Sequence, residues 1–295
     1  MQRVESEIAR LIDECNYSEV TRLFGMLSGG KRLRAKLILK IAPKSEDAPL
    51  LAAIVELIHG ASLLHDDVID EASTRRGVPS VNATEDSKTA VMLGDVLYSK
   101  AFTELVSFDK EVARTIAASV TALSKGEMQD VKMAEAFNSD EERYLEMLYL
   151  KTATLIEAAA VAAAHLGGKD TQKYGVYGRN LGLSFQIIDD ILDITSDEKT
   201  LGKPAMNDFV EGKCTLPYIY LFEMLNTQER EKLVSFHTKT LSKEESAWIQ
   251  EKMKEHGSVE KSFRLAQKLS AEAMNVVKED EELVNILKTM IERSY

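Results

Sequence analysis

Apolar residues recur every three or four positions along most of the chain, which is the period of an amphipathic α-helix. The first run extends from Arg3 to Leu27 and ends at Gly29-Gly30. The pattern predicts further helices at 32–41, 50–72, 89–106, 110–134, 140–166, 171–195, 218–224, 228–240, 242–254 and 259–292. The alternation expected of strands is absent throughout. We therefore expect an all-α fold.

Composition agrees with a helical protein and narrows its class. Only 15 Gly and 5 Pro occur in 295 residues, and residues 80 to 203 contain no proline. A net charge of −11 argues against nucleic acid as the main partner, because binding a polyanion normally requires surplus Lys and Arg. The length alone leaves one or two domains open.

The cysteines, the N-terminal residues and the most apolar stretch of the sequence bear on the location of the protein. Cys15 and Cys214 are too few for a disulfide or zinc framework, which favours a reducing compartment. The N-terminus shows no apolar region of a secretion signal. The most apolar stretch, Thr152 to Gly167, is interrupted by Glu157 and is shorter than the roughly 20 residues of a membrane span. We expect a cytoplasmic protein with no transmembrane segment, in which this stretch is a buried core helix.

One predicted helix, at 50–72, has polar residues on a single stripe. They return every three or four positions, at Glu56, His59, Ser62, Asp66 and Asp70. A narrow polar stripe on an otherwise apolar helix is typical of a cavity wall. His59 alone is more often a core histidine than a ligand.

Aspartates follow the same spacing at two places. Asp66 and Asp70, with Asp67 between them, put like charges one turn apart, where a cation would relieve their repulsion. The pattern recurs as Asp189, Asp190 and Asp193 within an otherwise apolar helix. One such motif alone could be a solvated acidic patch, but charges in an apolar helix are rarely left unpaired. The pair predicts a magnesium site for a diphosphate substrate, since Mg²⁺ combines one or two carboxylates with substrate phosphates.

Basic residues lie close to both motifs. The loop Gly29-Gly30-Lys31-Arg32-Leu33-Arg34 leads into a helix, whose free N–H groups would add to its attraction for phosphate. Arg75 and Arg76 follow the first motif, and either could instead be a solvated surface charge. Near the second motif stand Lys151-Thr152, and Lys203 and Lys213 lie in a polar loop at 196–216 that we take as a candidate lid.

These motifs, in this order, resemble those of the trans-isoprenyl diphosphate synthases. Gly29 to Arg34 is similar to the family's GGKRxRP box, and Leu64 to Gly77 to its first aspartate motif with RRG. Gly94-Asp95, Lys151-Thr152 and the second aspartate motif at 185–193 follow. Two departures are Ala35, where the box usually has Pro, and Met206, where Gly is common.

The resemblance implies an enzyme, a trans-prenyltransferase with a single-domain helical bundle of the isoprenoid synthase type over residues 1–295, a central cavity and usually a homodimer. It implies that isopentenyl diphosphate is held by Lys31, Arg34, His59 and Arg76, and the allylic diphosphate by Arg75, Lys151, Gln186 and Lys203, with Thr152 and Lys213 nearby. It further implies Mg²⁺ as cofactor on Asp66, Asp70 and Asp189, with Asp67 and Asp190 completing the catalytic aspartates.

Product length depends on what blocks the tunnel beyond the first motif. In short-chain relatives an aromatic residue commonly closes it near the positions of Ala61 and Ser62, and small residues here leave it open. The resulting hypothesis is a medium- to long-chain, octaprenyl-like all-trans product of about six to nine isoprene units, passed to the membrane and serving quinone side chains. Ile116 and Val120 are the candidates for the tunnel floor.

Three alternatives share part of this pattern. A short-chain synthase, making farnesyl or geranylgeranyl diphosphate, would have every catalytic motif and differ in the tunnel. A terpene cyclase has one aspartate motif but needs neither the GGKR box nor the RRG pair. A non-catalytic helical partner subunit would be expected to lose one aspartate motif, and this chain keeps both.

Overall fold

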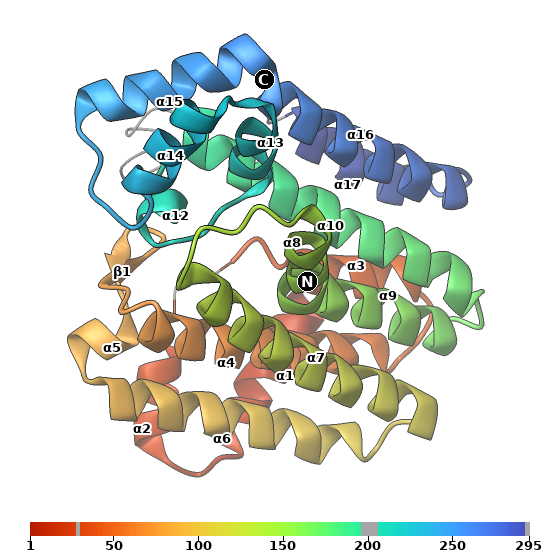
Figure 1. Ribbon diagram of the computed structural model, residues 1–295. Helices are drawn as coiled ribbons and strands as arrows, with labels where there is room; N and C mark the ends of the chain where they lie inside the picture. The colour runs from red at the N-terminus through yellow and green to blue at the C-terminus, as the bar shows by residue number, and fades with distance from the viewer. Residues whose placement is uncertain (28–29, 196–205, 293–295) are drawn as a thin grey trace. The chain divides into compact units, whose positions relative to one another are not determined.

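The computed structural model describes residues 1–27, 30–195 and 206–292. It divides the chain into two compact units, coloured by residue number in Figure 1. The first unit contains 1–121 and 155–175, and the second contains 122–154 and 176–295. Nearly every element is a helix, as the periodicity predicts.

The first unit is built around one buried helix, α4 (Ala48–Ile69), which packs against α1, α3 and α6. Leu51, Ile54 and Leu57 on α4 are fully buried, and Pro49 lies in its first turn, where the missing N–H costs nothing. The other helices of this unit are α1 (Gln2–Asp13), α2 (Ser18–Phe24), α3 (Leu33–Ile41), α5 (Val81–Thr84), α6 (Ser87–Leu105), the first half of α7 (Lys110–Ala134), most of α9 (Thr154–Leu166) and the start of α10 (Thr171–Thr195).

A small hairpin follows α4, where the sequence predicts only a turn and no strand. Strand β1 (Thr74–Arg75) pairs antiparallel with β2 (Val78–Pro79), and Thr74 lies opposite Pro79. Arg76 and Gly77 between them have φ angles of 53° and 78°. Two residues with positive φ make the tight connection whose twist suits a hairpin. The expectation of no strand was therefore wrong at this place.

The second unit contains the rest of α7 and α10 and the C-terminal helices. Its other elements are α8 (Glu141–Leu148), the π-helix η1 (Tyr149–Ala153), α12 (Asn207–Val210), α13 (Leu216–Met224), α14 (Thr227–Phe236), α15 (Lys243–His256), α16 (Ser258–Val276) and α17 (Glu281–Glu292). Helix α13 packs against α8, α15 and α16. Capping boxes begin α14 at Asn226 and α15 at Ser242, so the sequence marks these starts locally.

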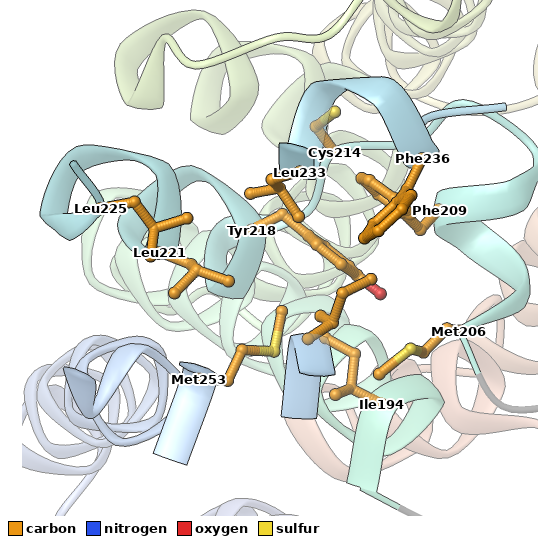
Figure 2. Packing of buried hydrophobic residues seen from close by; sticks show 11 residues of the cluster. Ile194, Met206, Phe209, Cys214, Tyr218, Leu221, Leu225, Leu233, Phe236 and Met253 are labelled. Atoms are coloured by element: carbon orange, nitrogen blue, oxygen red, sulfur yellow. The ribbon is translucent and has the colours of Figure 1, made fainter. Parts of the chain in front are cut away.

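An apolar cluster joins α12 to α13, α14 and α15 in this unit (Figure 2). The rings of Phe209 and Tyr218 stack with centroids 4.2 Å apart. Met206 enters the cluster with 1% of its surface exposed and has a φ of 61°, a conformation that favours glycine. The apolar burial of the Met206 side chain offsets the cost of this φ angle, so Met can stand where the family commonly has Gly.

Several expected boundaries differ from the structure. The run from Arg3 to Leu27 contains two helices, because Asn16 adopts a φ of 53° that a helix cannot continue through. The run at 259–292 is divided into α16 and α17. The loop expected at 196–216 contains α12, while its residues 196–205, including Lys203, lie outside the described part of the chain.

Two helical stretches are long and apolar enough to cross a membrane by length and composition. They are Ala48–Ile69 and Glu141–Leu166, and in each case 72% of the apolar window is buried within the protein. Core helices of soluble proteins satisfy the same criteria.

Candidate functional site

The first aspartate motif lies at the C-terminal end of α4 in the first unit. Asp66 is half-buried and Asp70, at the C-cap, is exposed. Asp67 is buried, and its Oδ1 accepts hydrogen bonds from Arg75 at 2.7 Å and 2.6 Å. Asn82 also donates to the backbone oxygen of Asp67 at 3.1 Å. The motif therefore presents two carboxylates and uses the third to hold the hairpin.

Basic side chains surround His59 in the same unit. Burial lowers the pKa of His59 well below its usual range, and the charges of Arg34, Arg76, Arg75 and Arg32 lower it further. Burial and the charge of Arg76 also lower the pKa of Arg34 to about 10, against the opposing effect of Glu56. A neutral histidine among arginines marks a strongly positive region, which favours an anion.

Glu56 of α4 binds the basic loop at residues 30–35, a role that the sequence did not predict. Its Oε2 lies 3.2 Å from Arg32, and its Oε1 accepts the backbone N–H of Ala35 at 3.1 Å. This N–H at the start of α3 is thus engaged by protein, although we expected free N–H groups here for phosphate. A proline at position 35 could not make this bond. Gly30 makes room for Arg76, whose Nη1 would be 2.9 Å from an added Cβ.

The second aspartate motif lies on α10 in the second unit, and its three carboxylates differ in exposure. Asp189 is exposed, whereas Asp190 and Asp193 are buried. Asp193 accepts the backbone N–H of Asp208 on its Oδ2 at 3.2 Å, and its backbone oxygen accepts that of Met206 at 2.8 Å. Asp193 therefore anchors the start of α12, and Asp189 is the carboxylate presented to solvent.

Asp190 is bound from two sides within this unit. The hydroxyl of Tyr144 donates to its Oδ2, and Gln186 Nε2 donates to its Oδ1 at 3.0 Å. Burial, together with the charge of Asp208, raises the pKa of Asp190 well above its usual range, while the two hydrogen bonds oppose that rise. Thr152 in turn donates to Gln186 Oε1 at 3.2 Å. The sequence indicated Gln186, Thr152 and Asp190 but gave no signal for Tyr144.

Lys151 is held by two buried carboxylates of α7 that sequence reasoning also missed. Its Nζ lies 2.9 Å from Glu127 Oε2 and 2.5 Å from Asp130 Oδ2. Lys151 and Thr152 stand in the π-helix η1, a local widening that is frequent at functional sites. Glu127 and Asp130 lie three residues apart on a predicted helix, and this spacing could have indicated that they share one face and bind a common cation.

Two glycines permit η1 to approach its neighbours. A Cβ added at Gly126 on α7 would lie 2.3 Å from Lys151 N, and one at Gly182 on α10 would lie 2.6 Å from the Cα of Ala153. Because both contacts are with backbone, larger side chains at either glycine would displace the Lys151-Thr152 step.

The remaining predicted residues are distributed over both units. In the first, Lys31 and Arg76 are exposed, and all four tunnel candidates are buried: Ala61, Ser62, Ile116 and Val120. In the second, Lys213 lies 2.9 Å from Glu211. Lys203 lies outside the described residues. The first unit thus contains a basic region with one aspartate motif, and the second contains a lysine-threonine step with the other.

The residues present suit a hard cation. The accessible donors of the motifs, Asp66, Asp70 and Asp189, are all carboxylates, which Mg²⁺ prefers. In the described part of the chain no three acidic, His or Cys side chains gather into a closed metal site. An arrangement with few carboxylates per motif leaves coordination positions for phosphate oxygens and water.

An all-helical fold with two such motifs defines a synthase of the isoprenoid class. The chain belongs to the polyprenyl synthetase family, whose model matches residues 19–254. It is 40% identical to a short chain isoprenyl diphosphate synthase of Methanothermobacter thermautotrophicus, over 70% of this chain and 68% of that one.

Solved structures show the same fold. The octaprenyl pyrophosphate synthase of Helicobacter pylori matches with a TM-score of 0.94 and 42% identity, over 98% of this chain and 97% of that one. A polyprenyl synthase of Caulobacter crescentus, complexed with calcium and isoprenyl diphosphate, matches with a TM-score of 0.82 and 28% identity, covering 98% of each chain.

These likenesses confirm the resemblance and the fold class stated from the sequence. The protein is a prenyltransferase of the trans-prenyl diphosphate synthase type. The names of its relatives include both short-chain and octaprenyl synthases, so they leave product length open.

Proposed function

We propose that this enzyme condenses isopentenyl diphosphate with an allylic diphosphate, preferably farnesyl diphosphate, to give a medium- to long-chain all-trans polyprenyl diphosphate. The observation that carries the product length is on α4, where Ala61 and Ser62 are small and have 0% and 4% of their surface exposed. They precede Asp66 by about one turn. Side chains as small as these do not block the path of a growing chain in the way that an aromatic side chain at this point would.

The proposed cofactor is Mg²⁺ on Asp66, Asp70 and Asp189. It is supported by exposure: Asp70 and Asp189 are exposed and Asp66 is half-buried, whereas Asp67 and Asp190 are buried. The Caulobacter crescentus relative was crystallised with calcium and isoprenyl diphosphate, which agrees with a divalent cation beside a diphosphate. When bound, the metal would stabilise the negative charge that develops on the departing diphosphate.

The chain's own residues would act by binding and orientation. Lys31, Arg34 and Arg76 would hold isopentenyl diphosphate, and the uncharged His59 could accept or donate one hydrogen bond to it without adding charge. Binding places the double bond of isopentenyl diphosphate near the allylic carbon, which reduces the entropy cost of the encounter.

Residues of the second unit would serve the allylic diphosphate. Lys151 is held at a fixed position by Glu127 and Asp130, and Thr152 and Gln186 are joined by a hydrogen bond. Lys203 and Lys213, together with Arg75 of the first unit, would add positive charge. The released diphosphate would take up the proton lost from the product. We further propose a cytoplasmic homodimer whose product serves quinone side chains in the membrane.

Replacement of Ala61 by Phe tests the proposed product length. The aromatic ring would block the path proposed for the growing chain, so the variant should stop after fewer condensations than wild type. Ala61→Ser, which stays small, is the control and should keep the wild-type length. Radiolabelled products are separated by reversed-phase chromatography. An unchanged length in an active Ala61→Phe enzyme would disprove the tunnel argument, and a wild-type product of farnesyl or geranylgeranyl length would favour the short-chain alternative.

A further inference from the structure

Tyr144 is a buried tyrosine of α8 whose hydroxyl is committed to the second aspartate motif. It has 3% of its surface exposed and donates to Asp190, which has 4% exposed and lies on α10. No other described residue except Gln186 donates to the Asp190 carboxylate. Burial of a carboxylate without hydrogen bonds is costly, so these two donors decide whether Asp190 can remain inside.

Anchoring Asp190 determines where its neighbour points. Successive residues of an α-helix are rotated by about 100° around the axis. With Asp190 held inward by Tyr144 and Gln186, Asp189 is directed to the exposed side of α10. Loss of the inward anchor would let α10 rotate or fray locally, and the Asp189 carboxylate would lose its orientation.

The segment formed by α8 and η1 makes a second hydrogen bond to α10. Tyr144 lies at one end of the stretch formed by α8 and η1, and Thr152 lies at the other, bonded to Gln186. Thr152, Gln186, Asp190 and Tyr144 therefore form one continuous hydrogen-bonded chain. The lysine-threonine step and the second aspartate motif are in this way held in a common register.

We propose that Tyr144 is a positioning residue: through Asp190 it holds the Asp189 carboxylate in the orientation that a divalent cation requires. The proposal rests on the proposed function, in which Asp189 is a metal ligand. Groups that orient a ligand by hydrogen bonding typically contribute 10- to 100-fold to metal affinity or activity.

Tyr144→Phe tests the proposal, with Tyr220→Phe as matched control. Tyr220 lies in the same unit and donates its hydroxyl to a carboxylate, Glu141 Oε1, at 2.6 Å, and neither this partner nor Lys261, which lies over its ring, belongs to the motif. Tyr144→Phe should lower kcat about tenfold and raise the Mg²⁺ concentration for half-maximal rate about tenfold, with the KM for isopentenyl diphosphate nearly unchanged. Tyr220→Phe should keep the wild-type Mg²⁺ dependence.

Asp190→Asn tests the same contact from the other side if Tyr144→Phe does not fold. Asparagine keeps the size of Asp190 but offers only one oxygen to the two donors, so this variant should also require more Mg²⁺. The double variant should lose little beyond Tyr144→Phe alone, because both changes break the same contact.

The proposal is overturned if Tyr144→Phe or Asp190→Asn, folded and assayed, shows the Mg²⁺ dependence of wild type. If Tyr144→Phe only lowers the melting temperature, and by as much as Tyr220→Phe does, the hydrogen bond is purely structural. That result would also overturn the proposal. The proposed function fails in a different way, namely if the wild-type enzyme shows no chain elongation. The behaviour of these variants therefore cannot be confused with failure of the proposed function.

Discussion

The middle aspartate of each motif is buried, and so is Asp193, whereas Asp70 and Asp189 are exposed and Asp66 is half-buried. Asp67 is paired with Arg75, and Asp190 is bound by Tyr144 and Gln186. The sequence predicts both motifs and their metal, but it cannot say which carboxylates are presented. That distinction depends on partners eight residues away in one motif and 46 away in the other.

At the residue scale, we expect Asp189→Ala to lower kcat about 100-fold, because under the proposed function the lost carboxylate helps to hold the metal that stabilises charge in the transition state. Asp13→Ala, which removes an exposed carboxylate at the end of α1, is the control and should be fully active. Rates are measured at saturating Mg²⁺. An Asp189→Ala enzyme as fast as wild type would exclude Asp189 from the metal site.

His59 makes stability depend on pH. Its pKa is lowered in the folded protein from the ordinary 6.5, because burial and the arginines disfavour the charged form. Below about pH 6.5 the unfolded chain therefore binds a proton that the folded chain does not, so stability is complete above 6.5 and is lost as the pH falls.

Urea unfolding measured about one pH unit above and one below 6.5 should show this loss, and His59→Gln should show a smaller loss over the same interval. Equal pH dependence in wild type and variant would mean that His59 does not carry the effect.

At the scale of elements, the sequence predicts helices well where the periodicity is uninterrupted. The expected bounds of α7 and α10 agree with the structure. The division of the first run at Asn16 and the π-helix η1 were not predictable, because a single positive φ and a widened turn leave the apolar spacing nearly unchanged. The closeness of η1 to α7 depends instead on tertiary contacts at Gly126.

Gly126→Ala should therefore disturb the lysine-threonine step. Its Cβ would meet the Lys151 backbone nitrogen at 2.3 Å, which requires a backbone shift and should cost about 1–3 kcal/mol of stability together with activity. Gly60→Ala is the matched control, because its Cβ would make ordinary contacts of 3.7 Å and 3.8 Å with two leucines. Urea unfolding compares the two variants. If both variants are equally stable, η1 can shift away from α7 without loss of free energy of unfolding, and this prediction is wrong.

At the scale of the whole molecule, each compact unit contributes one aspartate motif. If, as proposed, the enzyme binds an allylic diphosphate through Mg²⁺, farnesyl diphosphate should raise the melting temperature more with Mg²⁺ than without it, since a ligand stabilises the state it binds. The difference should be a few degrees at ligand concentrations about 100-fold above Kd. Asp66→Ala and Asp189→Ala should each remove most of it, and equal shifts with and without Mg²⁺ would contradict a metal-dependent site.

Product formation by the wild-type enzyme is the most direct test of the central claim. The enzyme is incubated with labelled isopentenyl diphosphate, farnesyl diphosphate and Mg²⁺, and the products are resolved by chromatography. We predict elongation to about six to nine isoprene units, abolished by chelation of the metal. No elongation in the presence of Mg²⁺ would contradict it.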